Sequence, residues 1–179
     1  WAEEPMVLIT GHRRENFGAP LEDICSALLD LCREFPWLKI LYPVHPNPNV
    51  RTTAQRLLSG NAQITLCEPL DYPDLVAAMQ QARLILTDSG GIQEEAPALA
   101  KPVLVLRAIT ERPEAVELGA AKVVGTTRAE IVRETRQLLL DREHYARMSR
   151  GVSPYGDGRA AERLCDIVVK YLHNTTLPT

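Results

Sequence analysis

Short apolar runs alternate with amphipathic stretches along most of this chain, and this alternation constrains its fold more than any other feature. Several runs are almost continuously apolar, which is typical of strands in a parallel sheet covered on both faces. The alternation predicts an α/β fold with a Rossmann-like, doubly wound parallel sheet. The expected strands are Met6–Thr10, Lys39–Val44, Gln63–Leu66, Leu84–Asp88, Val103–Leu106 and Lys122–Val124.

Amphipathic stretches predict the helices. Prolines at 20, 73 and 113 suit the first turn of a helix, and Gly119 suits a C-terminal cap. Pro97 lies inside one expected helix, which therefore either kinks or has an irregular first turn. From Arg128 onward the pattern indicates helices only, so we expect a helical C-terminal cap on the sheet. The expected helices are Pro20–Glu34, Val50–Leu58, Pro73–Ala82, Gly91–Ala100, Pro113–Leu118, Arg128–Asp141, Glu143–Met148 and Gly158–His173.

Composition narrows the class of protein. The 179 residues suit a single domain spanning 1–179, and 45% hydrophobic with 24% charged residues is ordinary for a globular protein. A net charge of −3, without a basic block interleaved with aromatics, argues against nucleic acid as a partner. No apolar run approaches the roughly 20 residues that span a bilayer. The acidic start at Trp1 is unlike a secretory signal, which favours the cytoplasm, and its lack of Met suggests a piece of a longer protein.

The cysteines indicate neither a disulfide framework nor a metal site. Cys25, Cys32, Cys67 and Cys165 form no CxxC pair, and we expect four reduced thiols in the core. No set of His, Cys, Asp or Glu residues has the spacing of metal ligands, so no metal is expected.

Polar clusters follow four of the expected strands. Because ligands of doubly wound sheets bind at the carboxyl ends of the strands, we expect one site on this rim. The clusters are Gly11–Asn16, His45–Asn49, Asp88–Glu95 and Arg107–Arg112.

The segment Leu86–Glu95 (LTDSGGIQEE) carries the most information about chemistry. Two glycines, Gly90 and Gly91, stand where an expected helix begins, and free N–H groups at a helix start can hold a phosphate. Glu94 and Glu95 fall in the expected first turn, from which a carboxylate can reach sugar hydroxyls. The alternative is a tight strand-to-helix connection that uses glycine only for its backbone freedom.

The other loops add cations. His12 and Arg13 follow the first strand and suit a diphosphate, whose charge grows if it leaves a sugar. His12 could neutralise the leaving phosphate or move a proton near neutral pH. Arg112 precedes a helix-start proline and could face the same anion, with Arg107 as a second candidate. The alternative for each loop is a solvated surface with Arg–Glu pairing.

His45 lies in a segment with three prolines, PVHPNPNV, which hold the loop stiff and present the imidazole at a fixed place. The alternative is a rigid loop with a surface histidine.

Four segments together resemble one family. GHRRENFG at 11–18, HPNP at 45–48, TDSGGIQEEAP at 87–97 and TERPE at 110–114 are similar, in the same order, to motifs of non-hydrolysing UDP-N-acetylglucosamine 2-epimerases. The resemblance covers the whole chain but only the C-terminal half of that family. It implies one half of a GT-B arrangement, with UDP-sugar bound between two Rossmann-like halves, and homodimers when full length.

The resemblance also implies the activity and the residue roles. The family interconverts UDP-GlcNAc and UDP-ManNAc by eliminating UDP across C1–C2 and adding it back, without cofactor or metal. Ser89, Gly90 and Gly91 would hold the phosphates and Glu95 the ribose. His12 and Arg112 would contact the UDP-sugar, with His12 catalytic. In bacterial members a second UDP-GlcNAc can bind nearby as an activator, at positions that Arg13 and His45 match.

This sequence departs from the family's motif at two positions near the uracil. Leu70 is present where the family has a Gln, and Leu75 is present where it has an aromatic residue. The rim also leaves no carboxylate pair for the proton at C2, and in the family these carboxylates belong to the N-terminal half. We therefore expect the fragment to bind UDP weakly and to turn over nothing.

Two other functions stay open from the sequence. A GT-B glycosyltransferase donor domain also places UDP against a Gly-rich turn and a helix Glu, and a stand-alone nucleotide-sugar sensor would use the same rim. Within the epimerases, UDP-2,3-diacetamido sugars are an alternative substrate.

Overall fold

A computed structural model of the chain describes residues 5–174, so the acidic start at residues 1–4 lies outside the described range. Six parallel strands form one sheet in the order β3-β2-β1-β4-β5-β6. This order confirms the predicted doubly wound fold, with the chain direction across the sheet reversing between β1 and β4. The strands are β1 (Met6–Thr10), β2 (Lys39–Pro43), β3 (Ile64–Cys67), β4 (Ala82–Thr87), β5 (Val103–Val105) and β6 (Ala121–Val123).

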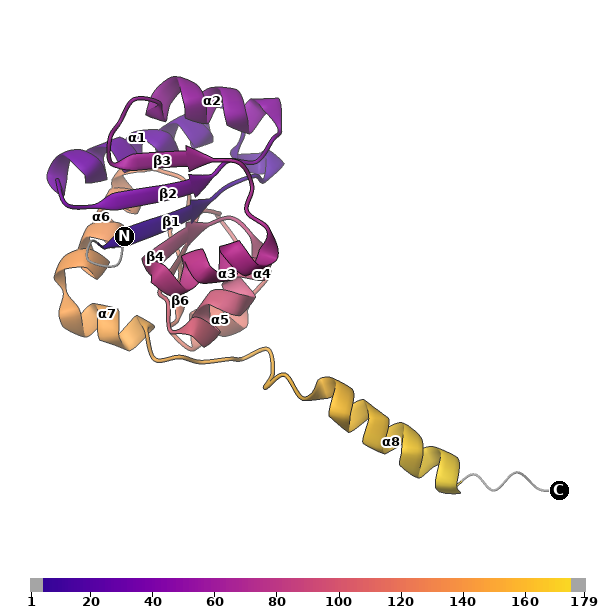
Figure 1. The fold of residues 1–179 in the computed structure, drawn as a ribbon. Helices are drawn as coiled ribbons and strands as arrows, with labels where there is room; N and C mark the ends of the chain where they lie inside the picture. Colours follow the sequence, from indigo (N-terminus) through magenta and orange to yellow (C-terminus); the bar gives the residue numbers. More distant parts are fainter. Residues whose placement is uncertain (1–4, 175–179) are drawn as a thin grey trace.

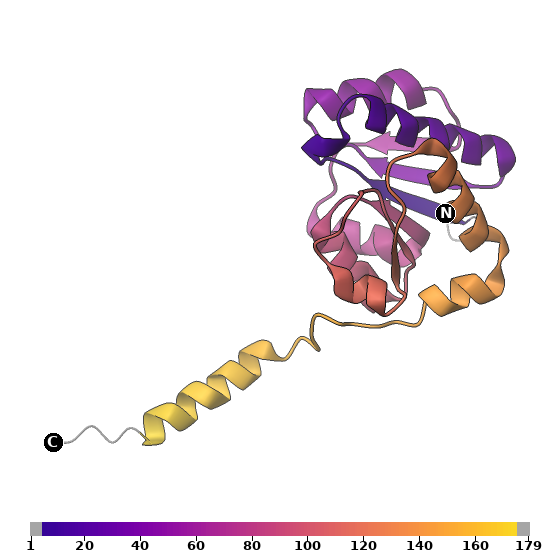
Figure 2. The same ribbon diagram turned by 180° about the vertical axis from the view of Figure 1, so that it is seen from behind.

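Helices cover both faces of the sheet, as Figures 1 and 2 show from opposite sides. The helices are α1 (Ala19–Glu34), α2 (Pro48–Leu58), α3 (Tyr72–Gln81), α4 (Gly90–Glu95), α5 (Pro113–Glu117), α6 (Arg128–Leu140), α7 (Arg142–Met148) and α8 (Ala160–Asn174), with 3₁₀ turns η1 (Arg14–Asn16) and η2 (Ala96–Leu99). Seven of the eight predicted helices are present with boundaries that differ by a few residues, and the predicted helix Gly91–Ala100 is divided between α4 and η2.

Alternating strand residues build two separate cores. Val7 and Ile9 of β1 face α1, α2 and α6, whereas Met6 and Leu8 face α3, α4 and α5. The side-chain period of two in a strand produces this division, and it explains why β1 is apolar at every position from Met6 to Ile9.

The structure decides how the chain accommodates Pro97. The α4 helix ends at Glu95, and the chain continues as the 3₁₀ turn η2, which contains Pro97 at an N-terminal position. The expected single helix Gly91–Ala100 is therefore two short pieces, because proline cannot donate the hydrogen bond of an α-helix interior. Ala100 ends the segment in the left-handed region, at φ 57°.

Two expectations are wrong: that α8 belongs to a helical cap on the sheet, and that all four cysteines lie in the core. The helix α8 does not cap the sheet; it extends away from the domain on the segment that follows α7 (Figure 1). Cys165 lies on α8 and is exposed, and Cys67 is half-buried, so only Cys25 and Cys32 are core thiols. Burial raises the pKa of Cys25 to about 12 and that of Cys32 to about 11.

Among the described residues, no helix combines the length and apolarity that crossing a membrane requires.

The packing of α6 gives a test of the fold. Leu138 is 0% exposed in the α1-side core, whereas Leu140 on the same helix is 61% exposed. We expect Leu138→Ala to lower the free energy of unfolding by about 2–5 kcal/mol, because it leaves a cavity. Urea unfolding followed by circular dichroism measures this, and Leu140→Ala is the matched control with a change of about 0.5 kcal/mol or less. Equal losses from the two variants would contradict the described packing.

Candidate functional site

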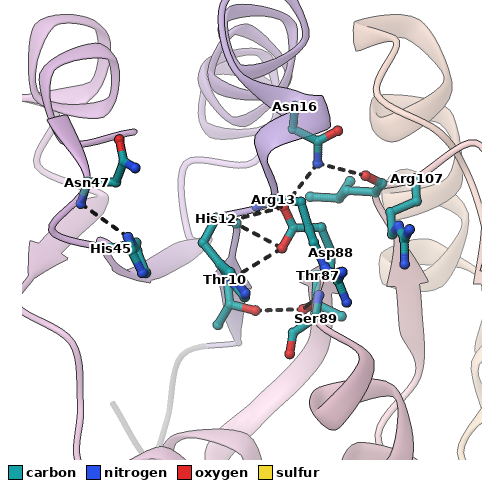
Figure 3. A network of polar contacts seen from close by, with 12 residues as sticks. Thr10, His12, Arg13, Asn16, His45, Asn47, Thr87, Asp88, Ser89 and Arg107 are labelled. Carbon is teal, nitrogen blue, oxygen red and sulfur yellow. Dashed lines mark hydrogen bonds and ion pairs between the residues drawn. The ribbon is translucent and has the colours of Figure 1, made fainter. Parts of the chain in front are cut away.

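The polar loops converge at the carboxyl ends of β1 and β4, the two strands between which the sheet order reverses. Crevices at this point bind ligands in doubly wound sheets. Thr10 and Thr87, the last residues of the two strands, are joined by a hydrogen bond of 2.6 Å between their hydroxyls (Figure 3). The loops after β1 and β4 therefore begin side by side.

Asp88 joins these loops (Figure 3). Its side chain is fully buried, and Oδ2 accepts hydrogen bonds from the backbone N–H groups of His12 at 3.0 Å and Arg13 at 2.9 Å. The same oxygen accepts from Asn16 Nδ2 at 3.0 Å, and the Asn16 amide also donates to the carbonyl of Leu106. A buried carboxylate requires such donors, since an unpaired buried charge is costly.

The Ser89–Gly91 turn starts α4 and faces two guanidinium groups. A Cβ placed on Gly90 would lie 3.8 Å from Nη2 of Arg13 and 3.9 Å from the guanidinium carbon of Arg112. Ser89 is the N-cap residue but makes no side-chain cap hydrogen bond, and its N–H donates to Thr87 Oγ1 at 3.0 Å. The first N–H groups of a helix lack partners within the helix. Cations and amide donors thus meet at one point.

Glu94 and Glu95 each hold one residue of the rim. Glu94 accepts a hydrogen bond from Arg112 Nε, and this bond raises the pKa of Arg112. Glu95 Oε2 accepts from the Tyr72 hydroxyl at 3.0 Å, which raises the pKa of Tyr72. The two carboxylates lie beyond the first turn of α4, contrary to expectation, because the helix begins at Gly90.

The imidazole of His12 stacks on that of His45, with ring centroids 5.5 Å apart and planes inclined by 19°. His45 Nδ1 accepts from the backbone N–H of Asn47 at 3.1 Å, so the ring is oriented by its own loop (Figure 3). The expectation that this loop presents His45 at a fixed place agrees with that bond.

A cavity of about 180 Å³ opens beside this histidine pair. Most of its wall is apolar, and Leu70 and Leu75, the two departures noted in the sequence, both contribute to it. Its lining residues are Thr10, Gly11, His12, Pro43, His45, Pro69, Leu70, Leu75, Ser89 and Ile92. The cavity therefore connects the Ser89–Gly91 turn with a small apolar surface.

Arg107 does not face the Ser89–Gly91 turn. Its Nε donates to Glu15 at 2.6 Å, and Nη2 lies 3.6 Å from Glu111. These contacts raise the pKa of Arg107, chiefly through the hydrogen bond with Glu15. Of the two arginines proposed for the anion, the structure places Arg112 at the turn and pairs Arg107 with carboxylates.

Sequence reasoning gave no role to Asp88, Asn16 or Tyr72. A signal for Asp88 was present, because an acidic residue directly after a buried strand needs several donors. Nothing in the spacing indicated Asn16 or Tyr72, since their partners are 72 and 23 residues away.

The fold and the rim define a class: a Rossmann-like α/β domain with a cationic site at the point where its sheet order reverses. The model of the UDP-N-acetylglucosamine 2-epimerase family matches residues 1–169, and the chain belongs to this family. The resemblance carried by the four motifs is thereby confirmed.

Individual relatives of this chain are also named as UDP-N-acetylglucosamine 2-epimerases. A probable UDP-N-acetylglucosamine 2-epimerase of Ralstonia solanacearum is 54% identical over 94% of this chain and 45% of its own length. A co-structure of S. aureus MnaA with UDP has a TM-score of 0.91 at 45% identity, covering 99% of this chain and 48% of that one. The epimerase of Neisseria meningitidis bound to UDP-GlcNAc has a TM-score of 0.90 at 44% identity, covering 93% and 45%. The chain thus spans about half the length of these relatives.

Gly90 provides a test of the anion site. A methyl group there would contact both guanidiniums at 3.8–3.9 Å, an ordinary contact distance that the fold accommodates. We expect Gly90→Ala to weaken the binding of inorganic pyrophosphate, measured by calorimetry, because the methyl occupies the space between the cations. Its thermal midpoint should not fall, since alanine is about 1 kcal/mol better than glycine in a helix. Unchanged pyrophosphate affinity would place the anion elsewhere.

Proposed function

We propose that this chain is the UDP-binding half of a UDP-N-acetylglucosamine 2-epimerase, with residues 1–179 as its single C-terminal domain. The observation that carries the proposal is the meeting of Arg13, Arg112 and the start of α4 beside an apolar cavity at the β1–β4 reversal. A nucleoside diphosphate has this combination of two charged phosphates and one flat base. Relatives of this chain have been solved with UDP and with UDP-GlcNAc.

The pyrophosphate lies at the Ser89–Gly91 turn. The amides of Gly90 and Gly91 and the Ser89 hydroxyl donate to it, while Arg112 offers a planar, bidentate cation. His12 faces the same space and stabilises the negative charge that develops when UDP leaves the sugar. His12 is therefore assigned as the catalytic residue of this half.

The nucleoside occupies the apolar cavity. The uracil packs on Leu70 and Leu75, and backbone groups replace the amide that a Gln at position 70 would supply. One oxygen of Glu95 is occupied by Tyr72, so the other accepts a hydrogen bond from a ribose hydroxyl.

The proposed reaction of the whole enzyme needs two sets of residues, one that binds the leaving UDP and one that transfers the proton at C2. As the C1–O bond breaks, its electrons leave with UDP, and the proton at C2 must be taken by a base to give 2-acetamidoglucal. Re-addition of UDP after protonation of the other face of C2 interconverts UDP-GlcNAc and UDP-ManNAc, without a redox cofactor or metal. This half holds the leaving group, and carboxylates of an N-terminal half move the proton.

The exposed apolar face of the helix α8 is evidence for a further N-terminal half of the protein. Leu164, Ile167, Val168 and Leu172 recur at helical spacing on it and are 52–64% exposed. An amphipathic helix without a partner is typical of a surface that another domain covers. We propose the N-terminal half of the same polypeptide as this partner, in a cytoplasmic homodimer that supplies cell-envelope polysaccharide synthesis.

A second UDP-GlcNAc, acting as an activator, belongs beside the first. Arg13 lies at the phosphate turn and His45 stacks on His12, so both residues proposed for that ligand adjoin the substrate site. This proximity suits two nucleotide-sugars that bind with linked affinities.

UDP binding by the chain tests the site. We expect Arg112→Gln to weaken UDP about tenfold or more, because a hydrogen bond to a charged group contributes roughly 1.5–3 kcal/mol. Calorimetry on wild type and variant measures this. Arg136→Gln is the matched control, since Arg136 pairs with Glu34 on the α1–α6 surface. Equal affinities of wild type and Arg112→Gln would remove Arg112 from the site.

Turnover by the isolated chain tests the division into halves. We expect neither UDP-ManNAc nor 2-acetamidoglucal when the chain is incubated with UDP-GlcNAc and followed by proton NMR, because the proposed assignment gives none of the described residues 5–174 the role of the base at C2. Supplying the encoded N-terminal half should restore epimerisation. Turnover by the 179-residue chain alone would refute this assignment.

A further inference from the structure

Asp88 contacts the His12–Arg13 segment through both its side chain and its main chain. The carboxylate accepts the backbone N–H groups of His12 and Arg13, and the Asp88 carbonyl accepts from Arg13 Nε at 3.3 Å. The side chain is 0% exposed, so it does not reach a ligand itself. Asp88 can therefore affect a ligand only indirectly, and His12 and Arg13 are the residues that it holds near the Ser89–Gly91 turn.

The carboxylate also lies against the His12 ring, with Asp88 Oδ1 3.5 Å from Nδ1 (Figure 3). An ionised carboxylate only accepts hydrogen bonds, so this approach favours a proton on Nδ1. Nε2 is then the ring nitrogen left for a ligand. Orientation of a histidine by a buried aspartate is a general means of selecting one tautomer.

The same residue directs Arg13. The bond from Nε to the Asp88 carbonyl leaves the terminal amino groups of the guanidinium free to face Gly90, where Nη2 comes within 3.8 Å of a Cβ position. A neutral carbonyl orients this guanidinium without neutralising it, unlike the carboxylate of Glu94 beside Arg112.

We propose that Asp88 is a positioning residue that sets the tautomer of His12 and directs the Arg13 guanidinium toward the Ser89–Gly91 turn. The inference rests on the proposed function, in which this turn holds the pyrophosphate of a uridine nucleotide. Asp88 itself takes no part in proton transfer.

Asp88→Asn tests this role because it keeps the shape and changes the donors. The three N–H groups on Oδ2 need an acceptor, so the Asn oxygen takes that place and its NH₂ turns toward His12 Nδ1. The variant should therefore move the His12 proton from Nδ1 to Nε2. Imidazole ¹⁵N NMR in alkaline buffer, where the ring is neutral, reports the tautomer, and His12→Gln identifies the His12 signals.

UDP affinity is the second readout. Beside the Asp88 carboxylate both ring nitrogens of His12 can donate at once, Nδ1 to Asp88 and Nε2 to the pyrophosphate, whereas the Asn NH₂ obliges Nδ1 to accept. We therefore expect Asp88→Asn to bind UDP about tenfold more weakly, roughly the difference between a charge-assisted and a neutral hydrogen bond from Nε2. Glu134→Gln is the matched control. Glu134 is only 2% exposed and bonds Lys122 at 2.6 Å and Arg133 at 2.8 Å, so its loss lowers stability while UDP affinity and the His12 signals stay unchanged.

The outcomes separate the two proposals. Wild-type protein that does not bind UDP would refute the proposed function, while the tautomer would still be measured. A wild-type His12 with its proton on Nε2 would overturn the role of Asp88, even if Asp88→Asn failed to fold. A folded Asp88→Asn that retains either the wild-type tautomer or the wild-type UDP affinity would overturn it as well.

Discussion

The hydrogen bonds that Asp88 accepts from the His12–Asn16 loop join the ends of two neighbouring strands, and the shape of the cationic rim depends on them. Without this carboxylate, the backbone N–H groups of His12 and Arg13 would lose their acceptor, and the contacts that hold the loop against the Ser89–Gly91 turn would be lost. Burying a carboxylate is costly unless donors surround it, so these hydrogen bonds favour one arrangement of the two loops. Side chains that are held in place before a ligand binds lower the entropic cost of binding.

The fold could be predicted because its signals are local. Apolar strands such as Met6–Ile9 and proline at helix starts specify element type without reference to distant residues, and the right-handed crossover rule then limits the topology. The errors arose where tertiary packing decides. Periodicity shows that α8 has an apolar face, but only packing shows that the rest of the described chain leaves this face uncovered. The expected burial of Cys165 failed for the same reason.

The sequence predicted that the polar loops meet at one edge of the sheet, and the structure brings those after β1 and β4 together. Parallel strands bring their carboxyl ends to one edge, so the motifs after β1 and β4 had to meet, and Arg112 lies where its position before Pro113 indicated. Partners of individual side chains could not be derived, since Arg107 and Arg112 follow the same strand and have similar chemistry. Which of them faces the turn depends on Glu15, whose hydrogen bond fixes Arg107. Which arginine pairs with which carboxylate therefore depends on tertiary contacts that the sequence alone does not reveal.

The pairing of Arg112 with Glu94 has a thermodynamic consequence for any phosphate ligand. An incoming pyrophosphate gains a guanidinium only as that guanidinium loses or shares its carboxylate, so the net gain is the difference between two charge-assisted bonds. Arg13 donates to a neutral carbonyl, so it can bind a phosphate without giving up a bond to a carboxylate. A site with one neutralised and one un-neutralised arginine binds a doubly charged group less tightly than its cations alone suggest. In the proposed reaction, UDP must return to the sugar after it has left. Weaker binding of the pyrophosphate suits that step, because binding the leaving group too tightly would oppose re-addition.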